Sequence, residues 1–319
     1  MLRSFFIYFS KAVWARRIVT GWSLAWKMAS RFISGNTLED AIQAAQSLNS
    51  KGINVTLDHL GEHTDTLEKA RQASQDILTA LDAIQRTGVR ANVSIKLTQI
   101  GLGVDPALCA ENLTAIVAHA HAKHNFVRVD MEDSAVTQLT LDLLYQVRAK
   151  GYDNGGIVIQ SYLYRSEADI RKLVDDCICI RLCKGAYQEP ASVAFPRKKD
   201  VDLSYDRLAA IMMDGSLKQS CPVVTPDGRF PPLLSLATHD PQRIEAAKKV
   251  AAEKKIPKEA VEFQMLYGIR RELQDQLVVE GYPVRVYVPY GTEWYPYYMR
   301  RLAERPANIW FFITNYFKK

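Results

Sequence analysis

Two adjacent arginines near the carboxyl end, Arg300 and Arg301, are the strongest sign of chemistry in this 319-residue sequence. They stand in a stretch with helical periodicity. At about 100° per residue, Tyr297 and Glu304 fall within roughly 60° of the same helical direction. A planar guanidinium binds both oxygens of a carboxylate at once, so two neighbouring arginines make a clamp for a small anion. The solvated end of an amphipathic helix would show the same pattern, and the rest of the chain must decide between these interpretations.

Eight short runs with strand-like composition alternate with helical stretches after the first fifty residues. The runs cover 53–58, 92–97, 126–130, 156–161, 177–183, 233–238, 261–266 and 284–290. The helical stretches cover 66–85, 106–121, 134–150, 166–174, 190–217, 241–254, 270–280 and 294–305. Such alternation predicts a parallel sheet, and eight units in about 240 residues predict a (β/α)8 TIM barrel. A doubly wound sheet also alternates, but it usually has fewer strands and a glycine-rich first turn, which this chain lacks.

Polar residues stand near the carboxyl end of every one of these strand-like runs. They are Asp58, Lys96, Asp130, Gln160, Arg181 with Lys184, Thr238 with His239, Gln264 and Tyr287. In a barrel those ends converge on one mouth, where active sites form. The sequence therefore predicts one polar site at the mouth of the barrel.

The segment RLCKGAY, from Arg181 to Tyr187, ends a strand with two cations and follows them with a glycine. Backbone amides beside a glycine can approach a ligand closely, which suits a nucleotide-type cofactor. A strand end whose cations simply reach solvent is the alternative. The chain has no P-loop, no G-x-S-x-G elbow and no Rossmann fingerprint, which disfavours a nicotinamide domain.

Cysteine and histidine usage predicts neither a disulfide framework nor a metal site. The five cysteines are odd in number, and Cys177, Cys179 and Cys183 share one strand-like run, so we expect reduced, buried thiols in a cytoplasmic protein. The segment HLGEH matches a zinc-peptidase pattern, but Gly61 interrupts the helix turn that the pattern requires. No apolar run reaches the roughly 18–20 residues that cross a bilayer.

The charge of the chain is concentrated in its first 38 residues. They hold six cations and no acidic residue, which leaves 41 − 6 = 35 basic residues against 35 acidic ones in the rest. Eight of the same residues are aromatic. We expect residues 1–38 to form helices packed on or near a catalytic barrel of residues 39–319. Contact of residues 1–35 with an anionic membrane is compatible with that packing. A transit peptide, which has a similar composition, is an alternative interpretation. Nucleic acid is not an expected partner.

Together these segments resemble the proline dehydrogenase family of flavoenzymes. The matching motifs, in chain order, are LDHLGE, SIKLTQIG, VRVDMEDS, IVIQSYLYR, RLCKGAYQEP, LATHD, EFQMLYG and YVPYG followed by WYPYYMRRLAERPAN. The likeness begins near Asn36 and is closest to the monofunctional bacterial enzymes. It implies a distorted (β/α)8 barrel that holds non-covalent FAD. It also implies oxidation of L-proline to Δ1-pyrroline-5-carboxylate by hydride transfer to flavin N5, with electrons passed to membrane quinone at the inner face of the cytoplasmic membrane.

The resemblance also implies roles for individual residues. Substrate contacts carry over to Lys96, Leu266, Tyr287, Tyr297, Arg300 and Arg301, with Glu62 as a gate that pairs with a substrate arginine. Catalytic roles carry over to Asp130 and Arg181. Cofactor contacts carry over to Met131, Gln160, Arg181, Lys184, Gly185, Ala186, Thr238, His239 and Glu304.

One departure and two alternative functions accompany the resemblance. Residues 216–234 are longer than the family pattern, so we expect the surroundings of the adenosine end of the flavin to differ. Another barrel enzyme, such as an aldolase with Lys96 as a Schiff-base nucleophile, would also suit a lysine at a strand end. A non-catalytic membrane-surface protein would explain the amino-terminal segment but not the converging polar strand ends.

Overall fold

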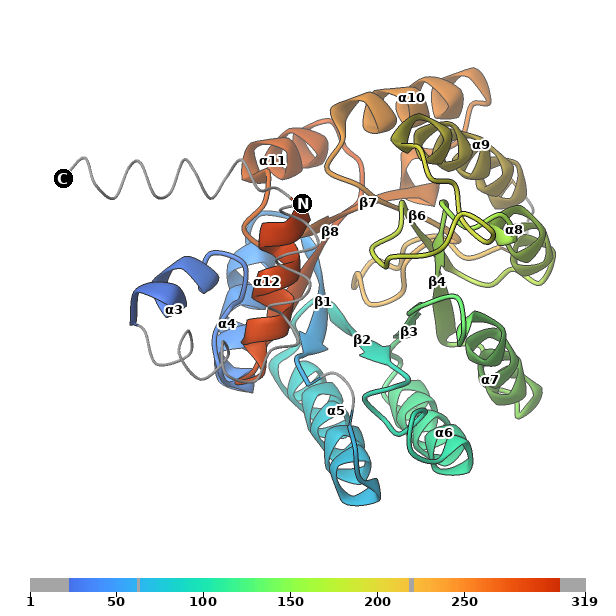
Figure 1. Ribbon diagram of the computed structural model, residues 1–319. Helices are drawn as coiled ribbons and strands as arrows, with labels where there is room; N and C mark the ends of the chain where they lie inside the picture. Colours follow the sequence, from blue (N-terminus) through green and yellow to red (C-terminus); the bar gives the residue numbers. More distant parts are fainter. Residues whose placement is uncertain (1–22, 62–63, 218–220, 305–319) are drawn as a thin grey trace.

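The computed structural model describes residues 23–61, 64–217 and 221–304, and these residues contain a closed barrel of eight parallel strands (Figure 1). The strands are β1 (Asn54–His59), β2 (Ala91–Lys96), β3 (Val127–Asp130), β4 (Gly155–Gln160), β5 (Ile180–Cys183), β6 (Leu234–Ala237), β7 (Val261–Leu266) and β8 (Val284–Tyr290). Each pairs with the next, and β8 pairs with β1. The predicted TIM barrel is confirmed, with every expected strand present.

Helices α4 to α11 surround this barrel on the outside, and α3 and α12 lie at one of its ends (Figure 1). They are α3 (Ser23–Ala29), α4 (Leu38–Asn49), α5 (Leu67–Thr87), α6 (Pro106–Ala122), α7 (Thr137–Ala149), α8 (Ser166–Asp175), α9 (Lys198–Ser216), α10 (Pro241–Glu253), α11 (Arg271–Val279) and α12 (Trp294–Glu304), with a short 3₁₀ turn at Lys258–Ala260. The stretch expected from residue 190 becomes helical only at Lys198. Helix α4 was not specifically expected, although Thr37 and Asp40 form a capping box at its start.

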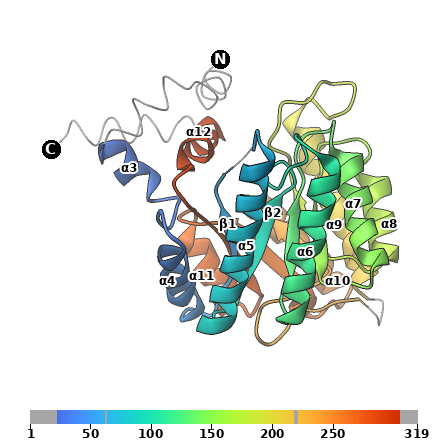
Figure 2. The same ribbon diagram turned by 90° about the horizontal axis from the view of Figure 1, so that it is seen from below.

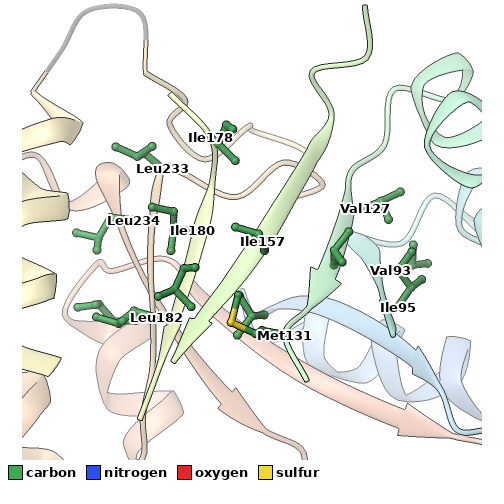
Figure 3. Packing of buried hydrophobic residues seen from close by; sticks show 14 of the residues in the cluster. Val93, Ile95, Val127, Met131, Ile157, Ile178, Ile180, Leu182, Leu233 and Leu234 are labelled. Atoms are coloured by element: carbon green, nitrogen blue, oxygen red, sulfur yellow. The ribbon is translucent and has the colours of Figure 1, made fainter. Parts of the chain in front are cut away.

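The two faces of the strands carry different chemistry. On β1, Val55 and Leu57 belong to the apolar core, whereas Thr56 and Asp58 between them are buried polar residues. Successive strand residues point to opposite faces, so the apolar set packs against the helices and the polar set enters the barrel. Figure 3 shows the apolar packing around β2 to β6. The interior of this barrel is consequently a polar column rather than a hydrophobic plug.

A loop closes the amino-terminal end of the barrel. The buried pair Glu262 and Arg285 approaches to 2.9 Å, and Arg285 donates a 2.7 Å hydrogen bond to the carbonyl of Gly228. Asn92 donates to the carbonyl of Arg229. This loop is the described part of the inserted segment, residues 221–234. Its position at the end opposite the mouth does not support the expectation that it alters the cofactor's adenosine side.

The expectation that all cysteines are reduced is wrong, because Cys177 and Cys221 form a disulfide with their Cα atoms 5.0 Å apart. Cys177 stands before β5 with a φ of 50°, so it does not share a strand face with the other two cysteines of its run. Burial raises the pKa of the Cys179 and Cys183 thiols to about 11. These two remain free thiols, as expected.

Helices α3 and α12 lie together at one end of the barrel (Figure 2). Ala29 and Ile33 join an apolar cluster with the aromatic residues of α12. Ser34 donates its backbone N–H to the carbonyl of Pro289, and Gly291 donates its own to the carbonyl of Gly35. The described part of the amino-terminal layer, from Ser23 onward, thus packs on the barrel, whereas residues 1–22 of the predicted layer lie outside the described residues. Within the described ranges, no helix has both the length and the apolar character needed to span a bilayer.

Candidate active site

A cavity of about 530 Å³ opens at the carboxyl-terminal mouth of the barrel. Its lining contains sixteen of the residues singled out from the sequence: Lys96, Asp130, Met131, Gln160, Arg181, Lys184, Gly185, Ala186, Thr238, His239, Gln264, Leu266, Tyr287, Tyr297, Arg300 and Arg301. Glu62 lies outside the described residues. Glu304 belongs to α12, but its side chain is likewise outside the described part of the chain. The strand ends therefore converge as the barrel prediction requires.

Asp130, the last residue of β3, is the centre of a hydrogen-bonded cluster on the cavity floor. Its Oδ1 accepts hydrogen bonds from the Ser94 hydroxyl at 2.7 Å and from Arg181 Nη1 at 2.9 Å. Its Oδ2 accepts one from the Tyr287 hydroxyl at 2.9 Å. Burial, followed by the nearby carboxylates Asp130 and Asp58, raises the pKa of Tyr287 well above its usual value. The phenol therefore stays protonated and keeps donating to Asp130.

Lys96, at the end of β2, contacts Asp58, a polar strand end that was predicted to lie near the mouth but was given no role. Its Nζ lies 3.3 and 3.4 Å from the two carboxylate oxygens of Asp58. The same nitrogen is 3.4 Å from the Tyr287 hydroxyl and 3.7 Å from Asp130 Oδ2. Asp58 had been noted only as a polar strand end. Ser94 was missed, although it stands two residues before Lys96 on the same inward face.

Residues at the end of β4 and in the loop that follows β5 build one wall of the cavity. Gln160 donates to the carbonyl of Glu132 at 2.8 Å and accepts from the backbone N–H of Ala186 at 3.1 Å. Gly185 has a φ of 129°, and a Cβ at this position would come within 2.5 Å of the Tyr162 ring. Only glycine fits here, and it lets the backbone of this loop lie directly against the cavity.

Charged residues and one histidine also line the cavity beside this loop. Lys184 Nζ contacts Asp202 at 2.5 Å and Asp240 at 2.8 Å. Burial, the largest single effect, acts to raise the pKa of both carboxyls. The hydrogen bond and charge of Lys184, together with Lys198 at Asp202 and with Gln242 and Arg243 at Asp240, outweigh it and hold each pKa below its usual value. His239 Nε2 accepts the backbone N–H of Leu266 at 3.0 Å, which requires that nitrogen to be unprotonated. No local sequence signal marked Asp202 as a neighbour of this site.

Helix α12 forms the roof of the cavity. Tyr297 is buried, and the Arg301 guanidinium carbon lies 5.1 Å from the centre of its ring. Arg300 and Arg301 are half-buried and line the cavity. The alternative of a solvated helix end is therefore wrong for this arginine pair.

Comparison with known sequences decides the family to which this arrangement belongs. A family model described as proline dehydrogenase matches residues 41–312. The chain belongs to the proline dehydrogenase family. It is 39% identical over 317 residues to proline dehydrogenase 2 of Bacillus subtilis, covering 99% of both chains. It is 41% identical to proline dehydrogenase of Deinococcus radiodurans, covering 92% of this chain and 91% of that one. Family membership makes it an oxidoreductase, implies proline as substrate and implies a flavin cofactor.

Comparison with solved structures agrees with this family assignment. Proline utilization A from Bdellovibrio bacteriovorus, solved after inactivation by N-propargylglycine, superposes with a TM-score of 0.76 at 25% identity. The superposition covers 87% of this chain but 32% of that one, so the chain spans about a third of that protein's length. The similarity to full-length single-function relatives identifies the monofunctional type. The aldolase alternative is not favoured.

Proposed function

We propose that this chain catalyses the FAD-dependent oxidation of L-proline to Δ1-pyrroline-5-carboxylate, the first step of proline catabolism. The observation that carries the proposal is the shared lining of one cavity. The arginine pair Arg300 and Arg301 lines the same space as the loop Lys184–Ala186 and the Asp130–Arg181 pair. A carboxylate clamp and a cofactor-type loop thus line one cavity, as binding of a small imino acid beside a cofactor requires.

The donor set of the cavity fits non-covalent FAD. Lys184 and Thr238 offer a cation and a hydroxyl, Gln160 offers an amide, and Gly185 gives the backbone close approach. A volume of about 530 Å³ lies within the usual range for a cofactor or ligand pocket. Met131 and Leu266 supply apolar surface for a flat ring. When bound, FAD would supply a hydride acceptor at its N5 and a route for electrons to a membrane quinone.

The residues of the chain would bind and orient the substrate. Arg300 and Arg301 bind the carboxylate of proline, and Tyr297 and Tyr287 contact its ring, while Lys96 assists at the carboxylate. Such orientation is essential because reacting atoms must approach to about 3–3.5 Å.

Asp130 orients the site rather than accepting the amine proton. The argument is that its two oxygens already accept three hydrogen bonds, from Ser94, Arg181 and Tyr287. A general base needs an oxygen directed at the proton it removes. A pH profile of flavin reduction in Asp130→Asn tests this assignment: an orienting role predicts a lower rate with an unchanged pH midpoint, and loss of the acidic limb of the profile would identify Asp130 as the base.

The decisive experiment uses the purified full chain with bound cofactor. Anaerobic addition of L-proline should bleach the flavin absorbance and yield Δ1-pyrroline-5-carboxylate. Arg301→Met should raise KM for proline by roughly 10- to 100-fold, the effect expected on losing a charged hydrogen bond. Arg171→Met, on the exposed surface of α8, is the matched control and should not change KM. A flavin that proline does not bleach would refute the proposed activity.

We also propose that the chain works at the cytoplasmic face of the membrane, where quinone is available. The support is the basic, aromatic composition of residues 1–35. The full chain should co-sediment with vesicles that contain anionic lipid, whereas a chain lacking residues 1–35 should remain in the supernatant. Equal binding of the two would remove this proposal. The proposed gating by Glu62 and cofactor contact by Glu304 concern side chains outside the described residues.

A further inference from the structure

We propose that Asp58 is a positioning residue for the reaction, acting as the counter-ion that holds the Lys96 ammonium at the cavity wall. This inference rests on the proposed function and extends it to a residue below the cavity. Asp58 is fully buried and does not line the cavity, whereas Lys96 does. Any effect of Asp58 on the substrate therefore passes through another side chain.

The strand register explains why these two residues meet. Asp58 on β1 is paired with Ser94 on β2, and Lys96 stands two residues further along β2. Residues two apart in a strand share a face, so the lysine reaches back from the layer above onto the carboxylate below. Its Nζ is then nearly equidistant from both Asp58 oxygens, at 3.3 and 3.4 Å. This geometry anchors the ammonium from beneath and leaves it at the cavity floor.

The two carboxylates near Lys96, Asp58 and Asp130, have different sets of contacts. Asp130 accepts three hydrogen bonds of 2.7 to 2.9 Å from Ser94, Arg181 and Tyr287, and its nearest oxygen is 3.7 Å from the lysine. Asp58 is closer to the lysine. Asp58 is thus the nearer counter-ion of Lys96 and Asp130 a more distant one, while Asp130 pairs more closely with Arg181.

Loss of the Asp58 charge would change which carboxylate the Lys96 ammonium contacts. A buried ammonium that loses its nearest counter-ion moves toward the other carboxylate in range, because weakly compensated buried charge is unfavourable. The next carboxylate is Asp130, and Lys96 would then compete with Tyr287 for its Oδ2. Lys96 would leave the position from which it assists the substrate carboxylate. The expected consequence is weaker binding of carboxylate ligands with the cofactor still in place.

The test is a double-mutant cycle with Asp58→Asn and Lys96→Met in the flavin-loaded full chain. Asp58→Asn should raise KM for L-proline about tenfold with a much smaller change in kcat. The same substitution should weaken the binding of tetrahydrofuroate by a similar factor. Tetrahydrofuroate is a proline analogue that keeps the carboxylate and lacks the amine. In the Lys96→Met background the same substitution should have no further effect. Additivity of the two changes, or a loss of kcat with unchanged KM, would overturn the proposal.

Folding of the variants gives a second readout. Asp58→Asn keeps the shape of the side chain but leaves a buried cation, whereas the double variant removes both charges. If Asp58→Asn misfolds, the double variant should restore a soluble, flavin-binding protein. Failure of both to fold would show that Asp58 serves the barrel and not the lysine. Bleaching of the wild-type flavin by proline is measured first, so failure of the proposed function is recognised separately.

Discussion

At the scale of single residues, the site depends on which charge is paired with which. Arg181 lines the cavity, yet its Nη1 lies 2.9 Å from Asp130 and its Nε donates to Gln264 at 2.6 Å. A cation fixed beside a bound flavin favours the reduced, anionic ring. Because Asp130 offsets part of that charge, the two residues should influence the reduction potential in opposite directions.

We therefore predict opposite shifts of the flavin reduction potential in two variants. Arg181→Ala should lower the two-electron potential by roughly 30 mV or more, equivalent to about 1.4 kcal/mol, whereas Asp130→Asn should raise it by a similar amount. Spectroelectrochemical titration of the purified protein measures both. Arg171→Ala on the outer surface of α8 is the control and should leave the potential unchanged. Shifts of the same sign in both variants would contradict the pairing argument.

At the scale of elements, the amino-terminal layer supports the arginine helix. The Trp26 and Trp294 rings have centroids 5.5 Å apart, joining α3 to the first residue of α12. Ser34 adds two hydrogen bonds to the carbonyl of Pro289, just before the loop that leads into α12. Since Arg300 and Arg301 follow about two turns later, α3 helps to set the position of the clamp over the cavity.

Shortening Trp26 should consequently weaken substrate binding from outside the cavity. We expect Trp26→Ala to raise KM for proline roughly 3- to 10-fold, because a modest displacement of a positioned group is costly, while flavin content is retained. Steady-state kinetics and the visible spectrum measure the two effects. Leu203→Ala, an exposed apolar residue on α9, is the matched control. A lower melting temperature with an unchanged KM would limit α3 to a stabilising role.

Element periodicity and polar strand ends predicted most of this arrangement from the sequence. Alternating strands and helices predicted the barrel, and the polar ends of the strands predicted the cavity lining, because parallel strands point their carboxyl ends the same way. What could not be predicted were contacts set by register and by long-range packing. Asp58 meets Lys96 only through the alignment of β1 with β2, and Asp202 reaches Lys184 from the separate helix α9. The disulfide escaped prediction because its cysteines are 44 residues apart.

At the scale of the whole molecule, the barrel is a polar column with chemistry at one end and a closure at the other. The column runs from Asp130 and Arg181 at the mouth through Gln264, which donates to Glu262, to the buried Arg285. Arg285 then donates to the carbonyl of Gly228 in the closing loop. This continuous network fixes the interior, so the closing loop can contribute to stability without contacting the cavity.

The disulfide should therefore change stability and not catalysis. Cys177 and Cys221 enclose a segment with a sequence separation of 44, for which loop-closure entropy alone gives about 4 kcal/mol. For a protein of this size we expect oxidised wild type to melt roughly 5 °C above the reduced form. Cys221→Ser should melt at the lower temperature with or without reductant. Calorimetry with and without dithiothreitol measures this, and mass spectrometry of the unreduced chain verifies the bond. Proline kinetics of the oxidised and reduced proteins should agree, since the bond lies at the end of the barrel away from the arginine clamp; a redox-dependent KM would show that the two ends are coupled.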